Sequence, residues 1–113
     1  MEKKNQSRTP WTYREFVTRF PELAAAHEQV GQAAEAAGPL EKRTQVLVKI
    51  GICAGAGLES ALRSQVRRAA EHGVTPQEIE HAILLGMNSI GFPSTVAAWR
   101  WAQTELSKSA EQE

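Results

Sequence analysis

The sequence predicts an all-α fold in a single domain that spans residues 1–113. Three observations support this prediction. Apolar residues recur at helical spacing over most of the chain, residues typical of helix starts and stops flank those stretches, and no two segments read as paired strands. The chain has 113 residues, of which 42% are hydrophobic and 23% are charged, and this length and composition suit one globular domain.

Pro21 separates the first two predicted helices. The first helix begins at Thr9–Pro10, because threonine can cap a helix and proline suits its first position. The second helix is rich in alanine, glutamate and glutamine, with apolar positions that include Leu23 and Val30. It ends at Gly38, a residue typical of helix C-termini.

The segment Gln45–Cys53 fits two structures. Its alternating β-branched residues, among them Val46 and Val48, favour a buried strand, but the other face is apolar too, so a buried helix also fits. A lone strand cannot satisfy its backbone hydrogen-bonding groups, which favours the helix. A helix that is apolar on most faces needs cover on most faces, which indicates a homo-oligomer.

Three further helices follow. The first carries Leu58 to Ala70 and closes at Gly73. The next begins at the predicted capping box Thr75–Glu78. The last runs from about residue 93 to Leu106, after a break at Gly91-Phe92-Pro93. Residues 1–8 and 107–113 are polar and are expected to be frayed.

Composition excludes several classes of protein. The net charge is zero, which argues against nucleic-acid binding across the surface. Cys53 is the one cysteine, so no intrachain disulfide and no multi-cysteine metal site can form. The longest apolar run, Val46–Cys53, is interrupted by Lys49 and is too short to span a bilayer. We therefore expect a cytoplasmic protein with no membrane partner and no cofactor.

A series of short motifs resembles the carboxymuconolactone decarboxylase family, which includes the alkyl hydroperoxidase D branch. The motifs are Gly38-Pro39-Leu40-Glu41-Lys42-Arg43-Thr44, the segment 61–69, the segment 73–79 and Gly91-Phe92-Pro93. The resemblance covers roughly Phe20 to Gln103. It implies an alkyl hydroperoxidase D-like domain of about six helices that assembles into trimers or hexamers, and it assigns the segment 45–54 to a helix.

The catalytic residues that the resemblance implies are absent. The peroxidase branch carries Cys-x-x-Cys-x-x-x-His, and these positions fall on Leu58, Ala61 and Gln65. The family's carboxylate would fall near Gln45 or Val46. The decarboxylase branch places histidines at Gln65 and at about Gly86, and both are missing. The thiol-peroxidase motif is therefore lost, and the active site is expected to be degenerate.

The remaining site residues lie on and near the same predicted helix. Gln65 and Cys53 are the catalytic candidates, although Cys53 also suits a small buried position. The substrate-binding candidates are Gln65, Arg63, Glu59 and Arg67. No metal site is predicted: the single Glu-x-x-His pair, Glu78 and His81, lacks the second pair that a di-iron site needs, and capping explains its glutamate.

Three functions remain open at this point. The first is a carboxymuconolactone decarboxylase-like protein that acts on, or binds, a small organic acid or lactone. The second is a non-catalytic member that binds a ligand or a partner protein. The third is a peroxidase or redox protein that uses Cys53.

Overall fold

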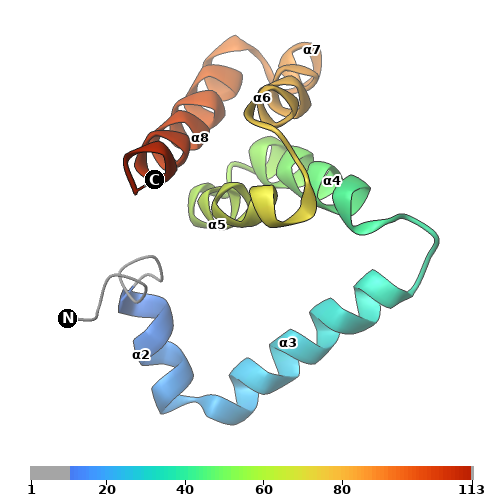
Figure 1. Ribbon diagram of the computed structural model, residues 1–113, viewed down its shortest axis with the longest axis vertical. Coiled ribbons are helices and arrows are strands. Elements are labelled where there is room, and N and C mark those ends of the chain that lie inside the picture. Colours follow the sequence, from blue (N-terminus) through green and yellow to red (C-terminus); the bar gives the residue numbers. More distant parts are fainter. Residues whose placement is uncertain (1–10, 113) are drawn as a thin grey trace. The chain divides into compact units, whose positions relative to one another are not determined.

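The computed structural model describes residues 11–112, and within them it contains helices and no strands (Figure 1). The all-α prediction is therefore confirmed. The helices are α2 Trp11–Arg19, α3 Pro21–Ala36, α4 Lys42–Ala56, α5 Glu59–Ala69, the short 3-10 turn η1 Ala70–His72, α6 Pro76–Leu84, α7 Met87–Ile90 and α8 Phe92–Gln112. No helix among the described residues is long and apolar enough to cross a membrane.

The chain divides into two compact units. The N-terminal unit spans Met1–Pro39 and the core unit spans Leu40–Glu113. The predicted helix start at Thr9–Pro10 and the expected fraying of residues 1–8 lie outside the described residues.

The N-terminal unit consists of α2 and α3, which contact each other. Neither helix contains a buried residue. Phe16 and Phe20 pack at the end of α2 with 5.0 Å between ring centroids, and the Arg19 guanidinium lies 5.5 Å from the centroid of the Phe20 ring. Pro21 begins α3 as predicted, because its fixed φ suits the first turn and it needs no hydrogen-bond acceptor there.

The core unit is built around α4, which contacts α5, α6 and α8 (Figure 1). The segment 45–54 is helical, as the absence of a partner strand had favoured. One face of α4 is buried in the core and carries Val46, Ile50, Cys53 and Ala54. The opposite face remains exposed, because Val48 and Ile52 keep 46% and 60% of their accessible surface.

Local chemistry explains where α4 and the α5–η1 segment end and where α6 begins. Gly57 and Gly73 adopt left-handed backbone conformations at φ 70° and 77°, which L side chains rarely adopt, and end α4 and the α5–η1 segment. The predicted capping box is confirmed at the start of α6. The Thr75 hydroxyl accepts a hydrogen bond from the Glu78 amide at 3.2 Å, and the Glu78 carboxylate accepts one from the Thr75 amide at 2.9 Å.

The last helix, α8, runs from Phe92 to Gln112 and so extends past Leu106, where the sequence predicted its end. Ala98 and Ala102 lie one turn apart on α8 and are fully buried. Such small residues allow a close approach between helices, and α8 packs extensively against α5. This contact brings the polar residues of α5 next to the C-terminal half of α8.

Candidate functional site

Helix α5 carries most of the residues that the sequence singled out. It buries Leu62, Val66 and Ala69 against the rest of the core unit. Their spacing of three and four residues makes one apolar stripe, and polar side chains flank the stripe on both sides. Arg63 and Gln65 are two positions apart, so their side chains leave α5 in directions that differ by about 200°.

On one side of the stripe, α5 and α8 share a cluster of charged side chains, here called the α5–α8 ion cluster. At its centre is Glu105 of α8, which is only 2% exposed. One oxygen of this carboxylate, Oε2, lies 3.3 Å from Arg63 Nη1, 3.4 Å from Arg67 Nη1 and 3.6 Å from Lys108 Nζ. Three cations from two helices therefore converge on one buried carboxylate.

Glu59 completes the cluster from the first turn of α5. Its Oε2 atom accepts hydrogen bonds from Arg63 Nη2 at 2.8 Å and from Arg63 Nε at 3.0 Å. This hydrogen bonding is the main reason that the pKa of the Arg63 guanidinium is raised, and partial burial opposes it. With three cationic side chains and two carboxylates, the cluster has a formal charge of +1.

The cluster brings together three of the four predicted substrate-binding residues. Glu59, Arg63 and Arg67 belong to it, while Gln65 lies half-buried on the other flank of α5. Glu105 was not predicted from the sequence, because it lies just before a polar tail that was expected to fray. Its spacing from Ala98 and Ala102 is the signal that could have found it, since residues at i, i+4 and i+7 share one helix face.

The flank that carries Gln65 also carries Leu58 and Ala61. These three positions are separated by three and four residues, so they lie on one side of α5. They are the positions at which the resemblance places two cysteines and a histidine. Here they present apolar groups and an amide, and none of these groups exchanges a proton near neutral pH.

Cys53 lies on the buried face of α4 and keeps 7% of its accessible surface. Burial raises the pKa of its thiol above the ordinary value of 9.0, and the charge of Lys49 offsets only part of this rise. The thiolate is the reactive form of cysteine, so this environment disfavours nucleophilic or redox chemistry at neutral pH. Gln45, near the expected carboxylate position, instead donates a hydrogen bond from Nε2 to the Leu40 carbonyl at 2.7 Å.

The glutamate of the Glu-x-x-His pair has structural roles that account for it. Glu78 caps α6 and also forms an ion pair with Arg43 of α4, while His81 is exposed. Among residues 11–112, no group of three or more His, Cys, Asp or Glu side chains is arranged to hold a metal ion.

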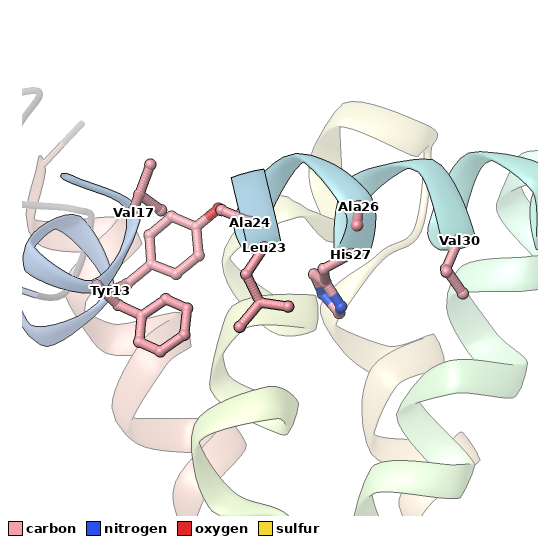
Figure 2. A pocket seen from close by; sticks show the side chains of 8 residues that line it. Tyr13, Val17, Leu23, Ala24, Ala26, His27 and Val30 are labelled. Atoms are coloured by element: carbon pink, nitrogen blue, oxygen red, sulfur yellow. The ribbon is translucent and has the colours of Figure 1, made fainter. Parts of the chain in front are cut away.

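The N-terminal unit contains an apolar groove between α2 and α3 with a volume of about 460 Å³ (Figure 2). Its walls are mostly aliphatic and aromatic, and the polar groups among them are the Tyr13 hydroxyl and the His27 imidazole. Figure 2 shows Leu23, His27 and Val30 extending from one side of α3. The groove is lined by Tyr13, Phe16, Val17, Leu23, Ala24, Ala26, His27 and Val30.

Comparison with known proteins agrees with the resemblance seen in the sequence. The model of the carboxymuconolactone decarboxylase family matches residues 21–104 of the 113. No curated protein matches the chain significantly. The match covers α3 and almost all of the core unit, and the all-α fold agrees with it. The chain therefore belongs to the carboxymuconolactone decarboxylase family.

Proposed function

We propose that this family member acts by binding and assembly and does not turn over a substrate. The observation that carries the proposal is the position of Glu105. If the chain were a decarboxylase-type enzyme, Arg63 or Arg67 would be expected to hold the carboxylate of a small acid. Both arginines instead pair with a buried carboxylate of the same chain.

The surroundings of Cys53 argue against a function in which its thiol reacts with a peroxide. A peroxidatic cysteine needs a low pKa and access to its substrate, whereas burial raises the pKa of this thiol. The sequence has no second cysteine that could resolve a sulfenic acid within the chain. A peroxidase based on Cys53 is therefore the least supported of the three functions.

The α5 flank that carries Gln65 supports the absence of acid–base chemistry. A general base must accept a proton near neutral pH, and the glutamine amide cannot do so. Gln65 can still donate and accept hydrogen bonds, so it is proposed as a ligand-contacting residue and not as a base.

The proposed partner is another copy of this chain, in a trimer or hexamer as the family resemblance implies. The N-terminal unit supports this proposal, because α2 and α3 contain no buried residue. Amphipathic helices of this length are marginal in water unless their apolar faces are covered. Self-association would supply that cover.

A second candidate function is binding of a small organic acid at the α5–α8 ion cluster. The cluster has a formal charge of +1, and the Arg63 and Arg67 side chains are 24% and 21% exposed. A ligand carboxylate could therefore reach the arginines, where it would compete with Glu105. Glu59, Arg63 and Arg67 would form this site.

Incubation with carboxymuconolactone, with released CO₂ as the readout, tests the proposal. The expected result is no release above the buffer blank. The proposal would be contradicted if the wild type released CO₂, Arg67→Met abolished this release, and the control Arg68→Met, a neighbouring exposed position, preserved it. Calorimetric titration with succinate tests the second candidate, for which saturable binding is expected that Arg67→Met removes and Arg68→Met retains.

A further inference from the structure

We propose that helices α6 and α8 form a binding site for a primary alkylammonium ion. The site, here called the α6–α8 anionic site, consists of Glu80 on α6 and of Trp99 and Gln103 on α8. It shares no residue with the α5–α8 ion cluster and carries the opposite charge. The inference therefore goes beyond the proposed function and does not depend on it.

The Glu80 carboxylate is fixed at one of its two oxygens. Its Oε2 atom accepts a hydrogen bond from Trp99 Nε1 at 2.9 Å and another from Gln103 Nε2 at 2.7 Å. The two donors are four residues apart, so they lie side by side on the surface of α8. These bonds hold the carboxylate in place before a ligand arrives, which lowers the cost of ordering the site on binding.

Neither partner of Glu80 neutralises its charge. The indole and the amide are neutral, so the α6–α8 anionic site has a formal charge of −1. Glu59, Glu78 and Glu105, by contrast, each pair with an arginine. Within residues 11–112, no ion pair joins Glu80 to a lysine or an arginine. This carboxylate can therefore accept a cationic ligand without first losing an ion pair.

The Trp99 ring offers a second contact for a cation. The residue is 38% exposed, and its N–H group donates to Glu80 from the edge of the ring, which leaves the ring faces out of this bond. Cations are attracted to the faces of aromatic rings, and tryptophan binds them best. A carboxylate next to an indole favours an organic cation, whereas a metal ion such as Ca²⁺ needs six or more oxygen ligands.

The second oxygen of Glu80 determines which kind of ammonium ion fits. Among the described side chains and backbone groups, none donates a hydrogen bond to Oε1. A primary ammonium group can donate a charge-assisted hydrogen bond to this oxygen, whereas a quaternary ammonium group has no N–H to donate. The site therefore favours a primary amine in its protonated form.

Apolar side chains next to the site suit a short alkyl chain on the ligand. Leu84 lies one turn after Glu80 on α6, and Val96 lies about one turn before Trp99 on α8. Their exposed fractions are 47% and 43%, so both are accessible. An alkyl chain that covered them would add apolar burial to the two contacts of the ammonium group.

Titration of the ¹⁵N-labelled full chain with n-butylammonium chloride, followed by NMR, tests the inference. The three tryptophans give three indole N–H signals, and the signal that Trp99→Phe lacks belongs to Trp99. We expect a saturable shift of this signal with a dissociation constant on the order of 1–10 mM. Neither n-butanol nor sodium butyrate should saturate it over the same range, and tetramethylammonium should bind at least about threefold more weakly.

Variants test the two contacts of the ammonium group separately. Glu80→Gln removes the charge but keeps an oxygen for both donors, and it should weaken binding by at least about fivefold. Trp99→Leu removes the ring and should weaken binding by at least about twofold, as followed through the Gln103 side-chain amide. The matched controls are Glu71→Gln, an exposed carboxylate on η1, and Trp11→Leu, an exposed indole on α2, and both should bind like the wild type.

Three results would overturn the inference. They are a wild-type signal that does not saturate with butylammonium, an equal response to n-butanol or tetramethylammonium, and a Glu80→Gln variant that is folded by circular dichroism yet binds as tightly as the wild type. The comparison of probes needs only the wild type, so it decides the question even where a variant fails to fold. Arg67→Met should bind butylammonium normally, so a failure here leaves the proposed function untouched.

Discussion

Replacing Glu105 with alanine is expected to destabilise the core unit by about 3 kcal/mol. The substitution removes the one carboxylate oxygen on which Arg63, Arg67 and Lys108 converge, at 3.3, 3.4 and 3.6 Å. The cations stay behind in a partly buried site without their shared partner. Loss of one partner from a buried ion pair typically costs about 3–5 kcal/mol.

The lower end of that range applies here for two structural reasons. The side chains of Arg63, Arg67 and Lys108 are 24%, 21% and 60% exposed, so water can partly solvate them after the substitution. Arg63 also retains its 2.8 Å contact with Glu59. A loss of about 3 kcal/mol corresponds to a fall in melting temperature of roughly 12–24 °C for a unit of this size.

Thermal and urea unfolding followed by far-UV circular dichroism provide the assay. Glu59→Ala is the matched control, because Glu59 pairs with Arg63 at the surface, and its loss should cost less than about 1 kcal/mol. Sodium propionate should partly restore the stability of Glu105→Ala, because its carboxylate can occupy the vacated position. Sodium chloride at equal ionic strength controls for screening.

Two results would refute this reasoning. If Glu105→Ala unfolded within about 1 kcal/mol of the wild type, the cluster would add no more stability than an ordinary surface ion pair. If propionate and chloride had the same effect on the variant, the arginines would not form a site for a carboxylate.

Three further predictions concern the core unit. Native Cys53 should react with iodoacetamide far more slowly than the urea-unfolded chain, and because its pKa is raised the native rate should still be increasing with pH above 9.0, as followed by mass spectrometry. Thr75→Ala should lower the free energy of unfolding by about 1 kcal/mol in urea melts through loss of the α6 cap, while Thr75→Ser should retain most of it. Leu62→Ala should cost about 2–5 kcal/mol in the same assay because the side chain is fully buried, and a value close to zero would show that α5 is not packed as described.

Local signals in the sequence predicted the parts of the fold that local chemistry decides. The capping box depends on Thr75 and Glu78 alone, three residues apart, and the structure confirms it. Pro21 and Gly73 likewise mark helix ends through backbone conformation. The helix at 45–54 was harder to predict, because its β-branched residues favour a strand. Burial between neighbouring helices outweighs that local preference.

Only part of the candidate site could be predicted from the sequence. Arg63 and Arg67 were singled out as candidates on one helix, but the partner that they share lies on α8, more than thirty residues away. A lone glutamate near a polar tail gives no hint of burial unless its spacing from Ala98 and Ala102 is examined. Spacing alone does not reveal what covers the apolar faces of α2 and α3, neither of which contains a buried residue.

Steady-state reduction of an alkyl hydroperoxide, with a dithiol as reductant, tests the central claim most directly: the chain keeps the family's fold without its thiol chemistry. Wild type and Cys53→Ser are compared at equal concentration. Equal rates are expected, no faster than the reductant alone, because the thiol is buried with a raised pKa and the positions of the cysteine pair carry Leu58 and Ala61. Wild-type turnover well above the blank that Cys53→Ser abolishes would contradict it.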